Sequence, residues 1–252
     1  MQPDPTGRFS ERVDDYRRHR PSYPVEAVEA VLRHLPELPV IADLGSGTGI
    51  FTALLLERGC RVYAVEPNEA MRLAAEVELQ EQPGFTSIAA PAEATTLPDA
   101  CVDAVTIAQA FHWFERDRAR LECKRILKPD GHAFILFNER QEDTTAFLRE
   151  YETLLHQYGT DYAQVDHRRV DAGMLQEFFG HTDYEALSFP YQQVLDWEGL
   201  AGRVRSSSYV PGEGQPGYSA MLAALRELFD AHQGDNTVTI HYDTRLFAGP
   251  LA

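Results

Sequence analysis

The feature that most constrains the fold is a glycine-rich turn between an apolar run and a helix-forming segment. Residues 40–44 are apolar apart from one acid, and glycines follow at alternate positions, Gly45, Gly47 and Gly49. A continuous apolar run is typical of a parallel strand buried on both faces, and residues 51–59 are good helix formers ending in glycine. Glycine permits positive φ and close approach of the backbone to a ligand. The stretch therefore predicts a strand, a tight ligand-binding turn and a helix.

Two departures separate this turn from the dinucleotide-binding fingerprint G-x-G-x-x-G, which has a small residue at its last place. That place is Ile50, and the third glycine, Gly49, comes one residue early. Asp43 stands two residues before the first glycine, where its carboxylate would repel a pyrophosphate and favour a ligand with an amino group or a sulfonium. These residues count against a nicotinamide dinucleotide.

A second acid follows the next apolar run. Residues 62–65 predict a short strand, with Glu66 at its carboxyl end and Pro67 after it. Ligands of doubly wound sheets bind outside the carboxyl ends of the strands, and the two carboxylate oxygens of Glu66 suit the two hydroxyls of a ribose. The alternative is a surface glutamate before a helix that begins at Pro67, since proline is favoured at the first helical position.

At this point the chain resembles a known family. Residues 43–49 (Asp-Leu-Gly-Ser-Gly-Thr-Gly) and Val65-Glu66-Pro67 are similar to the first two motifs of class I S-adenosylmethionine-dependent methyltransferases. Ala92-Glu93 and residues 108–114 (Ala-Gln-Ala-Phe-His-Trp-Phe) are similar to the motifs that follow. The second of these resembles a narrower branch, the methyltransferase type 11 and trans-aconitate methyltransferase-like proteins. The resemblance covers roughly residues 9–138.

The resemblance implies a cofactor, S-adenosyl-L-methionine, and its binding residues. The Ala-Glu pair is expected against the adenine, and the segment after the fourth strand is expected to close over the methionine moiety. Residues 1–24 are expected to fold across the cofactor as a lid, although a solvated arm is the alternative. The implied cofactor-binding residues are Asp43, Gly45, Ser46, Gly47, Thr48, Gly49, Glu66, Pro67, Ala92, Glu93, Gln109, Ala110 and Tyr16.

The rest of the chain predicts an α/β fold, because helical and strand patterns alternate throughout. By resemblance this is a Rossmann-like, doubly wound sheet of seven strands, mostly parallel, with an antiparallel last strand inserting at the sheet edge. We expect a single domain over 1–252, with a cap at about 159–217 for the substrate. Strands are expected at 40–44, 62–65, 85–89, 104–108, 133–137, 184–195 with an interruption at Pro190, and 237–247. Helices are expected at 25–35, 51–59, 69–80, 116–127, 144–158, 174–179, 197–206 and 218–232.

The net charge and the cysteine content limit the kinds of partner and ligand that we expect. The formal net charge is −16, and residues 17–20 are the only dense basic run, so a nucleic acid would meet a repulsive field. The three cysteines form no CxxC pattern, which favours neither a disulfide framework nor a zinc site, and we expect no metal. No apolar run approaches the ~20 residues of a membrane span, and the polar N-terminus is unlike a signal peptide. We expect a cytoplasmic monomer or homodimer with a small-molecule substrate.

Methyl transfer from a sulfonium is an in-line displacement with a neutral leaving group, so a base is needed only when the nucleophile carries a proton. His112 is the candidate base, because it follows the predicted fourth strand; the alternative is a histidine packed between Phe111 and Trp113. Within the predicted cap, Arg205 and Tyr209 are candidates for binding a substrate carboxylate, as is the neighbouring Arg203, although such residues more often form a solvated helix face. Trp113 is a candidate wall of the substrate pocket or a core residue.

The sequence therefore predicts an S-adenosylmethionine-dependent methyltransferase that acts on a small molecule, with a carboxylate such as trans-aconitate as the narrower expectation. A non-catalytic cofactor-binding subunit and a nicotinamide-dependent oxidoreductase are the alternatives. The first remains open because this chemistry requires no obligatory catalytic side chain.

Overall fold

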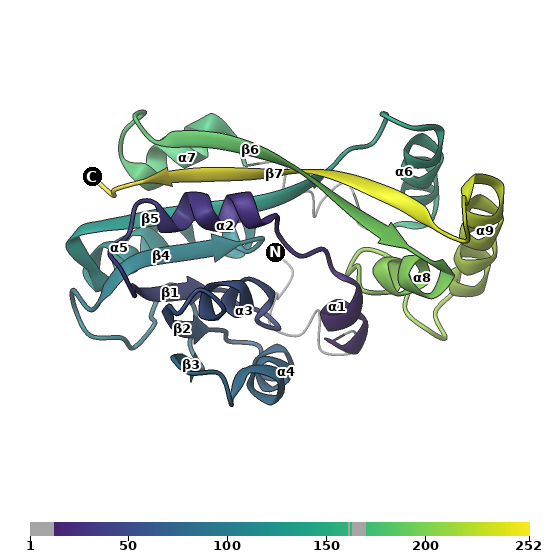
Figure 1. The fold of residues 1–252 in the computed structure, drawn as a ribbon. Helices are drawn as coiled ribbons and strands as arrows, with labels where there is room; N and C mark the ends of the chain where they lie inside the picture. Colours follow the sequence, from purple (N-terminus) through teal and green to yellow (C-terminus); the bar gives the residue numbers. More distant parts are fainter. Residues whose placement is uncertain (1–12, 161, 163–169) are drawn as a thin grey trace.

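The computed structural model describes residues 13–160, 162 and 170–252, and this part of the chain contains one mixed sheet of seven strands (Figure 1). Neighbouring strands from β3 to β5 run parallel, whereas β7 is antiparallel to both β5 and β6. In spatial order the strands are β3 (Phe85–Ile88), β2 (Arg61–Val65), β1 (Val40–Leu44), β4 (Val102–Ala108), β5 (Leu127–Arg140), β7 (Val238–Gly249) and β6 (Glu185–Leu195).

Helices cover both faces of the sheet, and three further helices pack around the far ends of β6 and β7 (Figure 1). Helices α2 and α3 pack on one face, α5 and α7 on the other, and α6, α8 and α9 form the third cluster. The helices are α1 (Val13–His19), α2 (Val25–Leu32), α3 (Ile50–Leu56), α4 (Glu69–Leu79), α5 (Arg116–Ile126), α6 (Ala146–Tyr158), α7 (Ala172–Phe179), α8 (Trp197–Arg205) and α9 (Tyr218–His232).

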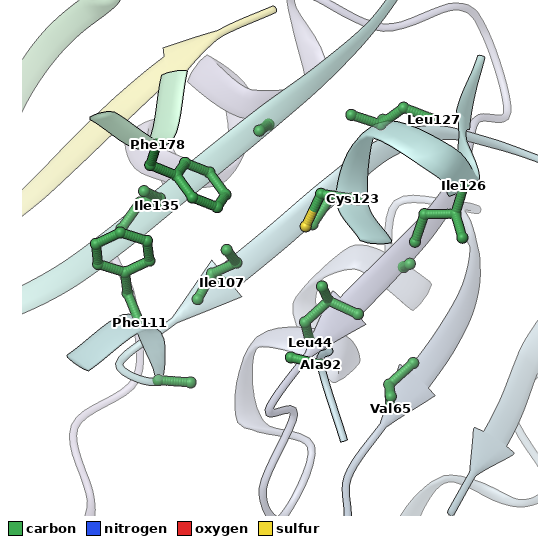
Figure 2. Packing of buried hydrophobic residues seen from close by; sticks show 14 of the residues in the cluster. Leu44, Val65, Ala92, Ile107, Phe111, Cys123, Ile126, Leu127, Ile135 and Phe178 are labelled. Carbon is green, nitrogen blue, oxygen red and sulfur yellow. The ribbon is translucent and has the colours of Figure 1, made fainter. Parts of the chain in front are cut away.

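The face under α5 and α7 holds the aromatic part of the core. Phe111, in the short 3₁₀ turn Phe111–Trp113 after β4, meets Phe178 of α7 edge-to-face with ring centroids 5.0 Å apart. Figure 2 shows both rings beside Ile135 of β5, with Ile107 of β4 nearby. These side chains are buried. Because apolar burial is the main stabilising contribution, this packing fixes the segment that follows β4.

The strand order reverses direction at β1 and β4, which are neighbours although they are distant in sequence. The loops that leave their carboxyl ends diverge, and a crevice forms at such a switch point. The N–H of Gly45, just after β1, donates to the carbonyl of Val65 at the end of β2 (2.9 Å). The N–H of Gln109, just after β4, donates to Leu136 of β5 (2.9 Å). The strand ends are thus held together around the crevice.

The predicted fold class is confirmed, with differences at the elements that depend on tertiary pairing. β7 inserts between β5 and β6, so the edge strand is β6. The predicted interruption at Pro190 is wrong: β6 continues through it, because an edge strand has one side on which no N–H is needed. β5 extends to Arg140, since its pairing with β7 continues to Tyr242.

The predicted lid and cap lie partly outside the described residues, which begin at Val13 and omit 161 and 163–169. Within the range predicted as a cap, α7 and β6 belong to the layers of the main sheet. Helix α8, the residues after it and Gln193 of β6 lie beside α1. A substrate-binding role for this range stays a prediction.

The loop that follows β3 is fixed by a carboxylate of α5. Glu122 Oε1 accepts from the N–H and the hydroxyl of Thr95 (2.7 and 2.5 Å), and Arg125 donates to both Glu122 oxygens. Hydrogen bonds from the Arg125 guanidinium, followed by those from Thr95, lower the pKa of Glu122. Thr95 is fully buried, so its N–H has no access to water.

We predict that Glu122→Ala lowers the free energy of unfolding by about 1–3 kcal/mol at neutral pH, because a buried N–H loses its acceptor. Glu122→Gln, which keeps one acceptor oxygen, is expected to lose less. A lowered pKa gives stability that is present above the unfolded-state pKa and is lost as pH falls through the folded-state pKa. Urea unfolding should therefore show the deficit of the alanine variant shrinking in acid, and an unchanged deficit would contradict this.

Candidate functional site

A cavity of about 420 Å³ opens at the carboxyl ends of β1 and β4. Its walls come from the glycine turn, the loops after β2, β3 and β4, the end of β5, α1 and the segment after α8. A volume of this size is typical of a small-molecule site. The cavity lies where the strand order predicts a ligand.

Glycine is required at Gly47 and at Gly49 of the turn for different structural reasons. Gly49 has φ +83°, and a Cβ there would lie 2.6 Å from Leu79 Cδ1, so this position is closed by packing on α4. Gly47 has φ +58°, but the nearest atom to its Cβ position would be Met71 Sδ at 4.0 Å. Gly47 lines the cavity and Gly49 does not. The missing side chain at Gly47 therefore leaves room for a ligand against the backbone.

Asp43 lies at the floor of the cavity and is 1% exposed. Its carboxylate accepts from the hydroxyls of Thr52 on α3 (2.6 Å) and Thr106 on β4 (2.8 Å). Burial raises the pKa of Asp43 to about 6, although both hydroxyls oppose the shift. An ionised carboxylate in this position would be stabilised by a cation in the cavity.

Glu66 is held by two backbone N–H groups, one in the glycine turn and one just after β2. Its Oε2 accepts from the N–H of Gly47 (2.9 Å), and its Oε1 accepts from that of Asn68 (2.8 Å). Burial raises the pKa of Glu66, while these two bonds favour the ionised form. Each oxygen retains acceptor capacity toward the cavity, since a carboxylate offers about four lone-pair positions.

The opposite wall follows β4. Gln109 has a strained φ of +60°, and its side-chain amide donates to the carbonyl of Asn138 on β5 (3.3 Å). Asn138 is buried and donates to the carbonyl of Ser22 (2.9 Å), which ties the segment after α1 to the sheet. His112 lines the cavity and packs on Trp113, with ring centroids 4.8 Å apart. Both interpretations of His112 are thus compatible with its position, and its role as a base stays a prediction.

The far end of the cavity contains three arginines, Arg20, Arg140 and Arg203. Arg140 forms an ion pair with Glu152 and donates to the Tyr162 hydroxyl (2.8 Å). Arg203 is 6% exposed and donates to Tyr242 (3.3 Å) and to the Ser207 hydroxyl (3.0 Å).

Arg20 completes this group from the end of α1. Its Nη2 donates to the carbonyl of Ser206 (2.9 Å), and its guanidinium lies 4.7 Å from the Tyr16 ring centroid. Its Nε is buried without a hydrogen-bond partner. Among the described residues no carboxylate pairs with Arg20 or Arg203. Uncompensated buried guanidinium groups are unfavourable, so this end of the cavity favours an anion.

The pKa of Tyr209 reflects the positive electrostatic potential of these arginines. Burial opposes ionisation of its phenol, yet the guanidinium groups of Arg203 and Arg20 outweigh it and lower the pKa of Tyr209. Burial and the neighbouring Arg203 likewise lower the pKa of Arg20. The electrostatics of the cavity therefore change from acidic at Asp43 and Glu66 to basic at the arginines.

The structure brings almost all of the predicted site residues into this cavity. Gly49 is excluded by its packing on α4. Arg205 is excluded as well, because its guanidinium makes a two-pronged ion pair with Asp15 of α1 (3.0 and 3.2 Å). The predicted residues that line the cavity are Asp43, Gly45, Ser46, Gly47, Thr48, Glu66, Pro67, Ala92, Glu93, Gln109, Ala110, Tyr16, His112, Trp113 and Tyr209.

Sequence reasoning missed Arg20, Arg140 and Asn138 as cavity residues and ranked Arg203 below Arg205. Arg20 belongs to the one dense basic run, which was a usable signal. Arg203 and Arg205 are two positions apart on α8 and therefore point to different sides of the helix. No local pattern distinguishes which side meets the cavity.

Comparisons with known proteins agree with this geometry. Residues 42–135 match the family model of a methyltransferase domain. An uncharacterized methyltransferase of Mycobacterium tuberculosis is 40% identical over 134 residues, 53% of this chain and 53% of its own. The chain thus spans about half the length of the first curated relatives that it matches. An uncharacterized methyltransferase-like protein of Schizosaccharomyces pombe is 28% identical over 250 residues, 95% of this chain and 94% of its own.

Solved structures share the whole fold. A protein of Anaeromyxobacter dehalogenans, proposed to be a type II methyltransferase, matches with a TM-score of 0.68 at 25% identity, over 92% of this chain and 98% of that chain. A methyltransferase of Geobacter sulfurreducens in complex with S-adenosylhomocysteine has the same fold with a TM-score of 0.54 at 16% identity, over 98% of each chain. Together the family model, these relatives and the shared fold support a class I S-adenosylmethionine-dependent methyltransferase. The trans-aconitate methyltransferase-like branch stays a prediction.

The cavity fits S-adenosylmethionine, the cofactor of this family, by the chemistry of its residues. Open space over Gly47 admits a ligand at the turn. The oriented acceptor oxygens of Glu66 suit a diol, and the buried carboxylate of Asp43 suits a cation. Within residues 13–160, 162 and 170–252, no helix is long and apolar enough to cross a membrane.

We predict that Asp43→Asn stabilises the ligand-free protein and weakens its affinity for S-adenosylhomocysteine, which carries an ammonium group. A pKa raised from 3.8 to about 6 gives stability that is present at low pH and lost as pH rises through 6. The ionised group therefore costs about 3 kcal/mol at pH 8.

Urea unfolding and calorimetry at pH 8 check both halves of this prediction, with the exposed Asp117→Asn as a matched control. A variant that is less stable and binds with unchanged affinity would show that Asp43 acts on packing alone.

Proposed function

We propose that this protein transfers a methyl group from S-adenosylmethionine to a small molecule that carries a carboxylate. The observation that carries the proposal is the charge reversal along one cavity, from Asp43 and Glu66 to Arg20 and Arg203. The acidic end attracts the ammonium and sulfonium groups of the cofactor, and the basic end attracts an anion. A cavity of about 420 Å³ that must hold both molecules favours a small acceptor.

In the proposed binding mode each group of the chain has one task. Glu66 accepts the two ribose hydroxyls, and Asp43 offsets the positive charge of the methionine moiety. Ala92 and Glu93 lie against the adenine, while Gln109, Ala110 and Tyr16 close around the remainder. The position of these residues around one cavity supports this assignment.

S-adenosylmethionine, when bound, supplies an electrophilic methyl group on a sulfonium. The chain must hold the acceptor in line with that group and exclude water; such positioning contributes up to about 7–11 kcal/mol to lowering the barrier. Tyr16, Trp113 and Tyr209 supply aromatic walls for this purpose. A carboxylate nucleophile requires no base, whereas for a protonated nucleophile His112 is the group placed to take the proton.

The arginines select the acceptor in this proposal. A guanidinium binds a carboxylate through two parallel hydrogen bonds, and Arg203 is held rigidly by Tyr242 and Ser207. Trans-aconitate is the narrower hypothesis within the class of carboxylates. The net charge of −16 counts against a nucleic-acid acceptor.

The ribose assignment predicts that Glu66→Gln weakens binding of adenosine about 10–100-fold, the usual range for loss of hydrogen bonds to a charged group. Binding of 2′,3′-dideoxyadenosine should change little, because this ligand lacks both hydroxyls. Calorimetric titration of both ligands into both proteins separates the ribose contact from a general loosening of the turn. Equal losses for the two ligands would refute the assignment.

The acceptor assignment predicts that a panel of small carboxylates yields S-adenosylhomocysteine, whereas the matched primary amides do not. Arg203→Gln should raise KM for an active carboxylate about 100-fold, while the protein still binds S-adenosylhomocysteine. Arg226→Gln, on the exposed face of α9, is the matched control. Unfolding curves of both variants test whether the buried substitution leaves the fold intact.

Equal turnover of amides and carboxylates would contradict the proposal, as would the absence of turnover with every carboxylate. Arg203→Lys keeps the charge and removes the planar fork, so its KM should lie between those of the wild type and the glutamine variant.

A further inference from the structure

Helix α1 is docked on α8 by polar contacts. Asp15 pairs with Arg205, the His19 carbonyl accepts from Gln193 (2.9 Å), and the His19 ring lies against Gly202, where a Cβ would come 2.1 Å from the ring. None of the residues of α1 is buried. A segment with few buried apolar contacts opens at low free energy, so α1 has the properties of a lid.

The same helix covers the cofactor end of the cavity. Tyr16 lines the cavity together with Gly47 and Glu66. On the outer side Arg17 pairs with Glu78 of α4 (2.6 Å). The two side chains are 34% and 55% exposed, and ion pairs that solvent reaches contribute little. Opening of α1 would therefore expose the cofactor site, and the contacts that oppose it are mostly polar.

Arg20 and Arg203 meet at the junction of this lid with α8. Arg20 donates to the carbonyl of Ser206, and Arg203 donates to the hydroxyl of Ser207, so adjacent residues anchor the two guanidinium groups. No carboxylate among the described residues lies between them, and Arg20 Nε is buried without a partner. The positive charge of Arg203 acts on Arg20 and opposes docking of the segment that carries Arg20.

We propose that the carboxylate of the acceptor binds jointly to Arg20 and Arg203 and thereby holds α1 closed over the bound cofactor. An anion bound between Arg20 and Arg203 attracts both guanidinium groups and thereby offsets their mutual repulsion. Acceptor and cofactor then bind cooperatively, and the coupling is reciprocal by thermodynamic linkage. This inference rests on the proposed carboxylate acceptor, and it adds that Arg20 is the positioning residue through which the acceptor retains the cofactor.

The test is the affinity for S-adenosylhomocysteine, measured by calorimetry in sodium succinate and in sodium chloride of the same ionic strength. Wild-type protein should bind about tenfold more tightly in succinate, within the usual range of allosteric coupling. Arg20→Gln should show the same affinity in both salts. Arg18→Gln, which changes an exposed arginine of α1, should behave as the wild type.

Hydrogen exchange of the amides of 13–20 gives a second readout that needs no activity. Exchange should be slowest when succinate and S-adenosylhomocysteine are both present, and the additional protection should vanish in Arg20→Gln. Gly202→Ala, whose Cβ displaces His19, should mimic the open lid and weaken cofactor binding in either salt.

The outcomes separate this inference from the proposed function. An unchanged affinity of the wild type in succinate, or an equal gain in Arg20→Gln, overturns the inference even if carboxylates are methylated. Coupling that is lost in Arg20→Gln supports it even if the panel of carboxylates yields no product, in which case the proposed reaction alone fails. Failure of S-adenosylhomocysteine to bind at all refutes both.

Discussion

The arrangement of the site depends on one buried carboxylate. Asp43 is the penultimate residue of β1. It accepts hydrogen bonds from the hydroxyls of Thr52 of α3 and Thr106 of β4, so it joins three elements where the strand order reverses. Burial makes its ionised form unfavourable, and its pKa of about 6 expresses that strain. A cationic ligand relieves the strain, whereas an anionic pyrophosphate would increase it. The same interaction therefore positions the glycine turn and selects the charge of what binds there.

At the basic end of the cavity, buried charges again lack full compensation, but here the charges are positive. Its guanidinium groups come from the residue after α1, from β5 and from α8. Tyrosines surround them, and of the three arginines Arg140 alone pairs with a described acid. A chain with a net charge of −16 has many carboxylates with which to neutralise Arg20 and Arg203, yet none of those described does so. Buried charge without a partner costs stability, and such local inconsistency is typical of functional sites. The two ends of the cavity together indicate a protein that binds two ligands of opposite charge.

The sequence predicts well those structural features that depend on local sequence patterns. The strand before Gly45, the acid at Glu66 and the helix Tyr218–His232 all follow from short-range periodicity and turn residues. Prediction fails where pairing between distant segments determines the bounds of an element. β5 extends to Arg140 because β7 continues alongside it, and no pattern in 133–140 indicates that partner. Likewise Arg205 meets Asp15, 190 positions away in sequence, and this contact removes it from the site. The arginine cluster is assembled from three distant segments, so the basic run at Arg20 was the one local signal and spacing could not reveal the cluster as a whole.

The most direct test of this account is a crystal structure of the protein with S-adenosylhomocysteine and succinate. It should show the ribose hydroxyls on Glu66, the ammonium group nearest Asp43, one succinate carboxylate between Arg20 and Arg203, and α1 docked on α8. A nucleoside bound away from Glu66 would contradict the assignment of the cofactor end. Succinate absent from the arginines, with the nucleoside in place, would contradict the claim that one cavity binds two ligands of opposite charge.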